Sequence, residues 1–197
     1  MGVKKKKEIK RCTWGVSGGD ELMIEYHDKE WGVPVHEDRH LFEVLVLDGA
    51  QAGLSWRTIL NKRENYRKAF DNFDVKKVSK YNSKKAQELM QNKGIVRNKL
   101  KIASAVRNAK VFMDIQKEFG SFDTYIWGFI NGKPIKNKFK KISDLPAKTE
   151  LSDEISKDLK NRGMNFVGST IIYAIMQTIG IVNDHQTDCF RYNKVGK

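Results

Sequence analysis

Both cysteines of the chain have a histidine at a spacing that suits a shared metal ion. Cys12 lies fifteen residues before His27, and His185 lies four residues before Cys189. The second spacing brings both side chains to one face if the backbone there is helical or makes a single turn. Two thiolates and two imidazoles would complete the tetrahedral shell of a structural zinc ion, which would tie the two ends of the chain together.

The same residues have a simpler interpretation, as two unrelated buried thiols with exposed histidines. The chain lacks the dense Cys-x-x-Cys arrays of many zinc proteins, so spacing alone favours this simpler interpretation. A Cys12–Cys189 disulfide is a third arrangement, which suits a cytosolic chain poorly. The other two histidines, His36 and His40, have no cysteine nearby.

One acidic residue interrupts an apolar segment and is a second candidate for chemistry. Asp48 directly follows Leu47 at the end of a run that is mostly apolar from Leu41. A carboxylate in an apolar helix is unfavourable unless it is paired, so Asp48 is a functional candidate on its own. The alternative is a helix-terminal aspartate in solvent.

Helices must position these side chains, because apolar residues recur at three- and four-residue spacing and sustained period-two alternation is absent. We therefore predict an all-α fold. Asp38 and Ser83 are predicted N-caps, and Gly94 and Gly163 are predicted helix stops. The lysine-rich segment 132–148, with two of the three prolines, is expected to be a surface connection. The predicted helices span residues 38–52, 56–70, 83–93, 98–119, 151–161 and 167–179.

The charge of the chain favours a polyanionic ligand. The formal net charge is +13; the first eleven residues hold six basic residues and one acidic residue, which give +5 and leave +8 for the rest. Excess positive charge on a folded body favours nucleic acid, and attraction to a membrane surface is the weaker alternative because no strongly amphipathic basic helix stands out. The apolar runs are too short to span a membrane and the basic start leads into no signal sequence, so we expect a cytoplasmic protein.

The length of 197 residues suits one domain, or two small helical lobes that share an interface. We predict a basic tail over residues 1–10 and a single domain over 11–197. The segment from Arg11 to about Cys189 resembles the type I DNA-3-methyladenine glycosylase family. The matching segments are Arg11–Trp14, Tyr26–Pro34, Gln51–Trp56, Lys62–Tyr66, Phe166–Thr170 and Val182–His185.

The resemblance implies a helix-hairpin-helix DNA glycosylase fold whose termini are joined at one structural zinc ion. The family's zinc ligands fall on Cys12, His27, His185 and Cys189. The hairpin falls on residues 94–98. There Gly94 would relieve backbone strain, amides would face a phosphate, and Arg97, Lys99 and Lys101 would supply charge. An ordinary helix–helix loop with solvated lysines is the alternative.

The resemblance also implies a base pocket. Trp56 would stack on the damaged base, Trp14 would form a pocket wall and Tyr26 would contact the base, whereas core packing is the alternative role of each tryptophan. Gly53 and Leu54 would form the turn that enters the gap left by the extruded nucleotide; otherwise Leu54 fills a helix junction. Asp48 is the candidate catalytic residue, since the family's acid accepts hydrogen bonds from the adenine edge.

Two positions depart from the family pattern. Asp48 stands where glutamate is usual, which shortens the arm by about 1 Å and could weaken the contact, admit a bridging water or be absorbed by shifts of the pocket. Met23 stands where some members have tyrosine, which puts one further pocket contact in doubt.

The expected function is that of a monofunctional glycosylase, which removes 3-methyladenine from alkylated double-stranded DNA, leaves an abasic site and releases the free base. No lyase step is implied, because no lysine stands in a recognisable Schiff-base motif. No membrane and no obligate protein partner are implied. The alternatives are a noncatalytic lesion-binding protein with a degenerate pocket, and a zinc-stapled scaffold that binds other proteins.

Overall fold

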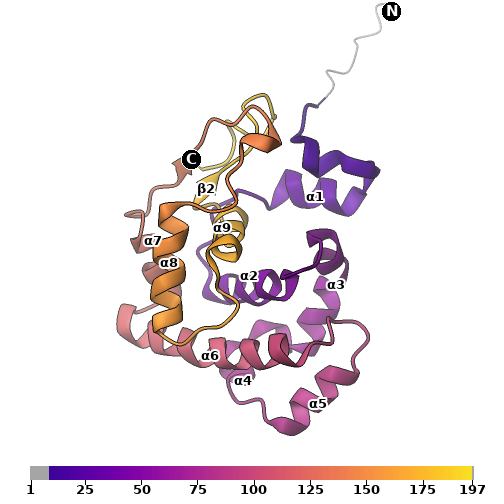
Figure 1. Ribbon diagram of the computed structural model, residues 1–197, viewed down its shortest axis with the longest axis vertical. Coiled ribbons are helices and arrows are strands. Elements are labelled where there is room, and N and C mark those ends of the chain that lie inside the picture. Colours follow the sequence, from indigo (N-terminus) through magenta and orange to yellow (C-terminus); the bar gives the residue numbers. More distant parts are fainter. Residues whose placement is uncertain (1–8, 197) are drawn as a thin grey trace, which may run out of the picture.

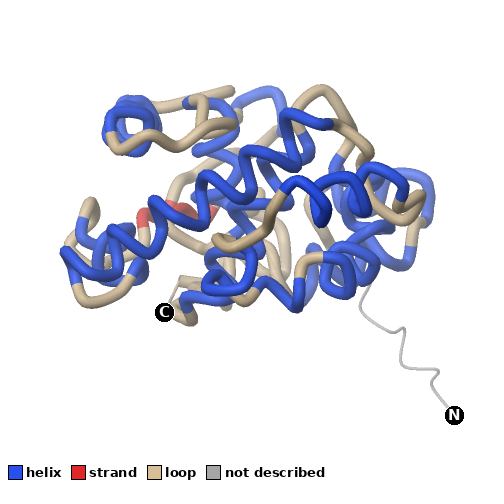
Figure 2. The backbone as a smooth tube through the Cα atoms, turned by 90° about the horizontal axis from the view of Figure 1, so that it is seen from below, coloured by secondary structure: helices blue, strands red, loops and turns tan. Residues whose placement is uncertain are grey.

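The computed structural model describes residues 9–196 and is mostly helical (Figure 1), which confirms the predicted fold class in outline. The only strands in the part of the chain that the structure describes are two short parallel ones, visible in red in Figure 2. The predicted tail over residues 1–10 falls largely outside the described residues. The elements are η1 (Thr13–Gly19), α1 (Glu21–Lys29), α2 (Asp38–Gln51), α3 (Trp56–Ala69), η2 (Asp71–Phe73), α4 (Val75–Val78), α5 (Ser83–Gln91), α6 (Lys99–Phe119), α7 (Phe122–Gly128), β1 (Ile135–Lys136), η3 (Ile142–Asp144), α8 (Glu150–Asn161), α9 (Ser169–Thr178) and β2 (Val182–Asn183).

Helix α2 is the centre of the fold. Every residue from Leu41 to Ala50 is buried, and α3, α6, α7 and α9 contact the helix on different sides. A helix that is apolar all round must be covered all round, which is why its neighbours surround it rather than flank one face. Asp48 is therefore carried into the interior by the most buried helix of the chain.

A second, smaller hydrophobic cluster joins the two ends of the described chain. It contains Cys12, Tyr26, Trp31, Leu60 and Cys189, and Trp56 packs against both this cluster and the main core. The backbone amide of Phe190 donates to the carbonyl of Lys10 at 2.9 Å, so the chain ends also meet through a hydrogen bond.

All six predicted helices are present, with ends that differ by at most two residues. Both predicted N-caps are wrong by one residue. The Glu37 carboxylate caps α2 and the Asn82 amide oxygen caps α5. The carboxylate of Asp38 instead accepts from the amides of Phe122 and Asp123 at the start of α7, and from Gln116.

The other deviations involve short elements and glycines. Helices α1, α4 and α7 were not predicted from the sequence. Each has nine residues or fewer, too few for a clear apolar repeat. Gly163 follows the end of α8 with φ of 102°, as a helix stop should. Gly94 lies beyond the end of α5, where Asn92 is the C-cap, so its predicted role as the stop is wrong.

Lys101 has a different role from the one predicted. Its ammonium donates to the carbonyls of Ala50 and Ala52, each at 2.7 Å, so it lies against the C-terminal end of α2. A cation there satisfies carbonyls that have no helical partner and interacts favourably with the helix dipole. Burial lowers the pKa of this ammonium. Lys101 was expected to supply charge at the hairpin, whereas its ammonium is bound to the end of α2.

Within residues 9–196, no helix combines the length and the apolar character that crossing a bilayer requires.

Replacing Lys101 with methionine should destabilise the fold, because two partly buried carbonyls lose a charged donor. We expect a loss of about 1.5–3 kcal/mol in the free energy of unfolding, measured by urea denaturation. Lys110→Met, on an exposed position of the same helix, is the matched control and should change stability by less than about 0.5 kcal/mol. Equal effects of the two variants would contradict the assigned role.

Candidate active site and Cys/His cluster

A cavity of about 340 Å³ lies between α1, α2, α3, α9 and the loop that contains η3. This volume lies in the range of small-molecule pockets. The structure brings together all four residues predicted for base binding and catalysis, Trp14, Tyr26, Asp48 and Trp56. The other lining residues are Met23, Trp31, Gln51, Ile142, Leu145, Pro146, Ala147, Thr170, Tyr173, Ala174, Gln177 and Thr178.

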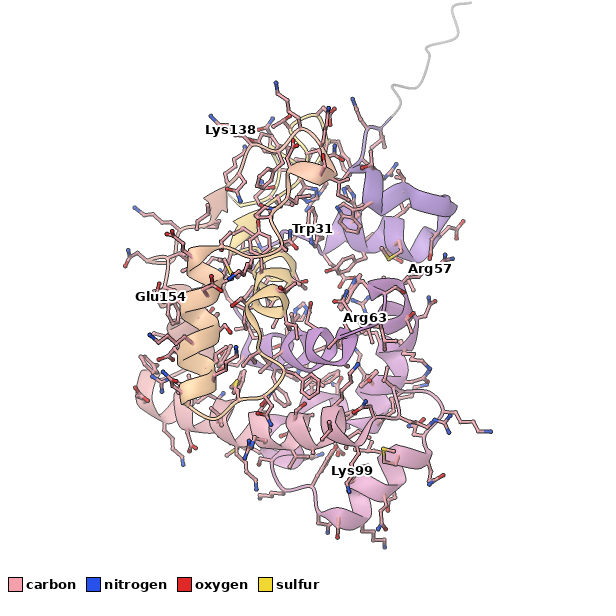
Figure 3. All side chains as sticks on the ribbon, viewed as in Figure 1. Trp31, Arg57, Arg63, Lys99, Lys138 and Glu154 are labelled. Atoms are coloured by element: carbon pink, nitrogen blue, oxygen red, sulfur yellow. The ribbon has the colours of Figure 1, made fainter. Side chains whose placement is uncertain are left out.

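Aromatic rings form one side of the cavity. The ring centroids of Tyr26 and Trp56 are 5.3 Å apart with an interplanar angle of 48°, and those of Trp14 and Trp31 are 4.7 Å apart, edge to face. Trp31 appears in Figure 3 between α1 and α9. Such a wall presents π-faces to a ligand, and a cationic ring system gains most from it.

Asp48 provides the acidic group of the cavity. Its side chain is buried, and its Oδ2 atom has no hydrogen-bond partner within the protein. Burial raises the pKa of this carboxyl well above its ordinary value of 3.8. Buried polar atoms are normally paired, so an orphaned carboxylate oxygen in a cavity indicates a group that is completed by a ligand.

The indole Nε1 of Trp56 is also buried without a partner, so the cavity offers an unpaired donor as well as an unpaired acceptor. The hydroxyl of Thr178 donates to the carbonyl of Ala174 and accepts from the hydroxyl of Tyr26 at 3.1 Å. The phenol oxygen of Tyr26 therefore keeps a lone pair for a ligand donor. Burial, and then the charge of Asp48, raise the pKa of Tyr26, so the phenol is neutral at physiological pH.

Two ion pairs fix α1 against α3 and so set the distance between Tyr26 and Trp56. Asp20, the N-cap of α1, forms an ion pair with Arg57 at 2.5 Å. At the other end of α1, Glu30 binds Arg63 through two parallel hydrogen bonds of 2.5 and 2.9 Å. Both arginines lie on α3, on the right of the molecule in Figure 3. A bidentate arginine–carboxylate pair restricts orientation as well as distance.

The predicted wedge turn lies between α2 and α3. Gly53 has φ of 76°, a left-handed conformation that favours glycine, and the amide of Leu54 donates to the carbonyl of Gln51. The Leu54 side chain is 40% exposed, so it does not fill a helix junction. A second hollow of about 200 Å³ adjoins the main cavity here and is lined by Leu54, Gly53 and Asp48 among others.

One wall of the cavity was not predicted from the sequence. Residues 142–147 belong to the segment expected to be a simple surface connection, yet four of them line the cavity. No local pattern could have indicated this, because the contact depends on the tertiary position of the loop. Trp31 was likewise not predicted as a lining residue, although its place in the segment with Tyr26 and His27 was an available signal.

The predicted hairpin is the turn between α5 and α6, which are in contact. Two of its amides are already paired: Gly94 donates to the side chain of Asn92, and Val96 donates to the hydroxyl of Tyr66. The expectation that these amides face a phosphate is therefore wrong for Gly94 and Val96. A Cβ at Gly94 would approach Asn65 to 2.9 Å, so close packing explains this glycine better than backbone strain.

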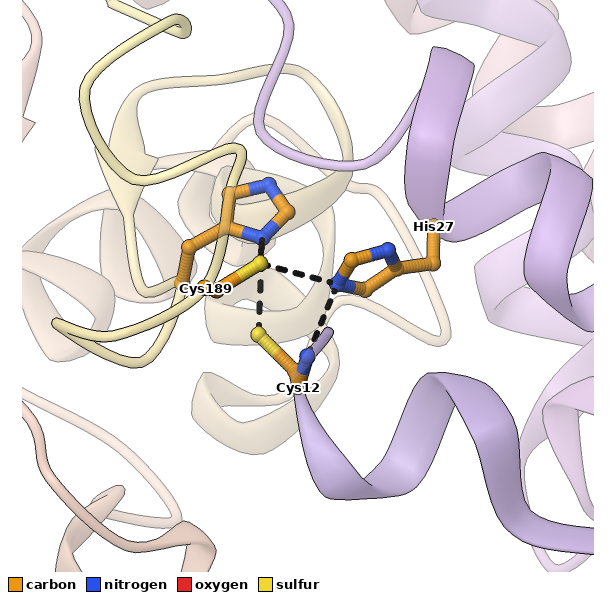
Figure 4. A group of neighbouring side chains, drawn as sticks. Cys12, His27 and Cys189 are labelled. Carbon is orange, nitrogen blue, oxygen red and sulfur yellow. Dashed lines mark hydrogen bonds between the residues drawn. The ribbon is translucent and has the colours of Figure 1, made fainter. Parts of the chain in front are cut away.

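The four predicted metal ligands converge in a buried cluster (Figure 4). One ligand atom from each of Cys12, His27, His185 and Cys189 lies within 4.8 Å of the others, a group that could hold a metal ion. Cys12 Sγ is 3.5 Å from His185 Nδ1, and Cys189 Sγ is 3.5 Å from His27 Nε2. Both histidines are fully buried and both cysteines are free, which excludes exposed histidines and a disulfide.

The ligand side chains are oriented by further contacts. His27 Nδ1 pairs with Asp28 at 2.8 Å, and His185 Nε2 lies 3.0 Å from the carbonyl of Trp31. The amide of Gln186 donates to the sulfur of Cys12. The pKa of the Cys189 thiol lies well below its ordinary value, because Cys12, His185 and His27 stabilise the thiolate. Thiolate and oriented neutral imidazole are the forms that bind metals.

The methyladenine glycosylase family model matches residues 14–192. The chain is 46% identical to the DNA-3-methyladenine glycosylase of Haemophilus influenzae over 179 residues, which cover 91% of this chain and 96% of that protein.

Solved structures agree with the sequence comparison. A crystal structure of 3-methyladenine DNA glycosylase I superimposes with a TM-score of 0.88 at 43% identity, covering 92% of this chain and 98% of the other. The Staphylococcus aureus enzyme, solved to explain its recognition of 3-methyladenine, gives a TM-score of 0.87 at 33% identity and covers 91% and 95%. The chain belongs to the methyladenine glycosylase family.

Replacing Asp48 with asparagine should stabilise the free protein at neutral pH. Because the folded-state pKa of Asp48 is raised, the unfolded chain ionises at a lower pH than the folded one, and stability is lost as pH rises above about 4. Asparagine does not ionise, so Asp48→Asn should raise Tm by a few degrees at pH 7 and by much less at pH 4. Asp114→Asn, an exposed control, should show no such difference. A lower Tm for Asp48→Asn at pH 7 would contradict this explanation.

Proposed function

We propose that the chain hydrolyses the N-glycosidic bond of 3-methyladenine in alkylated DNA and leaves an abasic site. The single observation that carries this proposal is the aromatic cavity that holds the orphaned carboxylate oxygen of Asp48. Family membership supports the same reaction.

The cavity suits a cationic purine better than a neutral one. Methylation at N3 makes the base cationic, and the faces of Trp14 and Trp56 attract a cation. Asp48 and the free lone pair of Tyr26 accept hydrogen bonds from the amino edge of adenine. A cationic base also lowers the pKa of Asp48 and restores its negative charge, so ligand charge and acid charge are coupled. A neutral adenine provides no such compensation.

Extrusion of the damaged nucleotide precedes recognition, because the cavity cannot reach a stacked base. Leu54 enters the gap left by that nucleotide, held out by the turn at Gly53. Helices α5 and α6 form a helix-hairpin-helix element on which Arg97 and Lys99 contact the DNA backbone, with Gly94 allowing the close packing of the turn. Lys101 fastens this element to the helix that carries Asp48.

Hydrolysis requires little acid catalysis. The bond between the sugar C1′ and the base nitrogen breaks, and the bond electrons neutralise the positive charge of the leaving base. Water adds its oxygen to C1′ and releases a proton. The chain acts mainly by orienting the cationic base and stabilising charge in the aromatic cavity. No lysine forms a covalent intermediate, so strand cleavage is not part of the reaction.

The Cys/His cluster holds one structural zinc ion in this proposal. In a tetrahedral zinc shell a sulfur and a nitrogen lie about 3.5 Å apart, given bonds of about 2.3 and 2.0 Å. The measured S···N distances are 3.5, 3.5 and 3.6 Å. Gly15 supports the cluster, since a Cβ there would meet the His27 ring at 2.8 Å. With four protein ligands the ion takes no part in the reaction.

Because its substrate is DNA, we propose that the protein acts in the cytoplasm, at the bacterial nucleoid. We also propose that residues 11–197 form a single domain. The alternative function is that of a noncatalytic lesion-binding protein, which would bind alkylated DNA without turnover.

The direct test is release of methylated bases from alkylated duplex DNA under multiple turnover. We expect free 3-methyladenine as the product, a loss of at least tenfold in kcat/KM for Asp48→Asn, and a similar loss for Trp56→Ala, because each removes a contact to the base. Binding of alkylated DNA without release of any base would favour the noncatalytic alternative.

Metal analysis of protein purified without chelator tests the cluster. We expect about one zinc per chain, and Cys189→Ser should lower both zinc content and Tm, because the metal joins the two chain ends. His36→Ala, at an exposed histidine outside the cluster, should leave the zinc content unchanged. A metal-free protein of unchanged Tm would exclude the structural zinc ion.

A further inference from the structure

We propose that the loop from Asn137 to Lys148 is a DNA-binding surface, which contacts the damaged strand on the side of the pocket opposite Leu54. This inference rests on the proposed glycosylase function and adds a contact surface to it. The loop contains the short helix η3 and lies at the end of the molecule that holds the Cys/His cluster.

The first observation is the position of Ile142. Its side chain lines the main cavity and is nevertheless 49% exposed, so it lies at the rim of the cavity mouth. Leu54 is 40% exposed and lines the hollow that adjoins the same cavity. The main cavity and the hollow beside it therefore each have one exposed aliphatic side chain in their lining. An extruded nucleotide that enters the cavity passes between them, and its flanking nucleotides lie over both.

The second observation is the charge of the loop. Lys138, Lys140 and Lys141 are exposed, and no acidic side chain of the described residues forms an ion pair with any of them. The carboxylate of Asp144 accepts from the amides of Lys140 and Lys141, so it is turned toward the loop backbone. Figure 3 shows Lys138 directed outward from this end of the molecule. Cationic side chains beside an apolar rim fit the phosphates and sugars of a DNA strand.

The third observation is that the loop is held firmly in place. The amide of Asn137 donates to the carbonyl of Asn183, and the amide of Thr187 donates to the carbonyl of Phe139. Gln186 donates from its side chain to the carbonyl of Lys140 at 2.8 Å. The anchoring segment 183–187 includes His185 of the cluster, so the lysines are presented from the same part of the structure that joins the chain ends. A preordered surface loses little entropy on binding.

The test replaces Lys140 and Lys141 together with serine, which keeps the backbone hydrogen bonds of the loop. The control replaces Lys157 and Lys160 with serine, which removes the same charge. Both are exposed lysines of α8, and neither lines the cavity. Binding of a short fluorescent duplex that carries one abasic-site analogue is measured by anisotropy at several salt concentrations. Binding of free 3-methyladenine is followed by tryptophan fluorescence.

We expect the loop variant to bind the duplex several-fold more weakly and to reduce the slope of log Kd against log salt by about one for each phosphate that the variant no longer neutralises. Its affinity for free 3-methyladenine and its Tm should match those of the unmodified protein. The control should keep the unmodified slope.

Equal slopes for the two variants would overturn the inference, and base release by the unmodified protein would then leave the proposed function standing. A reduced slope for the loop variant, in a protein that releases no base, would support the surface and reject the enzyme.

Discussion

The pocket depends on the closure of the chain's two ends around Cys12, His27, His185 and Cys189. Trp14 and Tyr26 lie on η1 and α1, whose buried residues belong to the smaller hydrophobic cluster rather than to the core around α2. Both helices are short, and a short helix has little stability of its own. The Cys/His group and the two ion pairs to α3 add contacts between these helices and the rest of the fold.

The wall of the pocket that α2 forms is held by burial of the helix instead. Helix α2 is buried on every side, which makes it rigid, and it carries Asp48 to a position where one carboxylate oxygen has no partner. Such a group lowers the stability of the free protein and is useful only when a ligand completes it. Lys101, near the start of α6, donates to the last carbonyls of the same helix. The start of α6 is therefore bound to the segment that lies between Asp48 and the Leu54 turn.

Much of the fold and four residues of the pocket could be predicted from the sequence, for identifiable reasons. Long amphipathic helices have a clear period, and the Cys/His spacing combined with the family resemblance indicated the cluster that the structure brings together. Lys101 could not be assigned correctly, because a lysine near a hairpin has the same pattern whether it faces phosphate or carbonyls. Ile142 was missed for a related reason: its loop acquires a role only through its anchors at residues 183–187.

Selectivity for a cationic base follows from the electrostatics of the whole pocket rather than from a single contact. A neutral purine in the cavity would further desolvate Asp48 without adding a positive charge, so the acid would remain protonated and could no longer accept from the base through both oxygens. A cationic purine reverses both effects, since it stabilises the carboxylate and gains from the surrounding rings. In the proposed reaction, the charge that makes the base a good leaving group is also the charge that the pocket would bind, so recognition and bond cleavage would favour the same lesion.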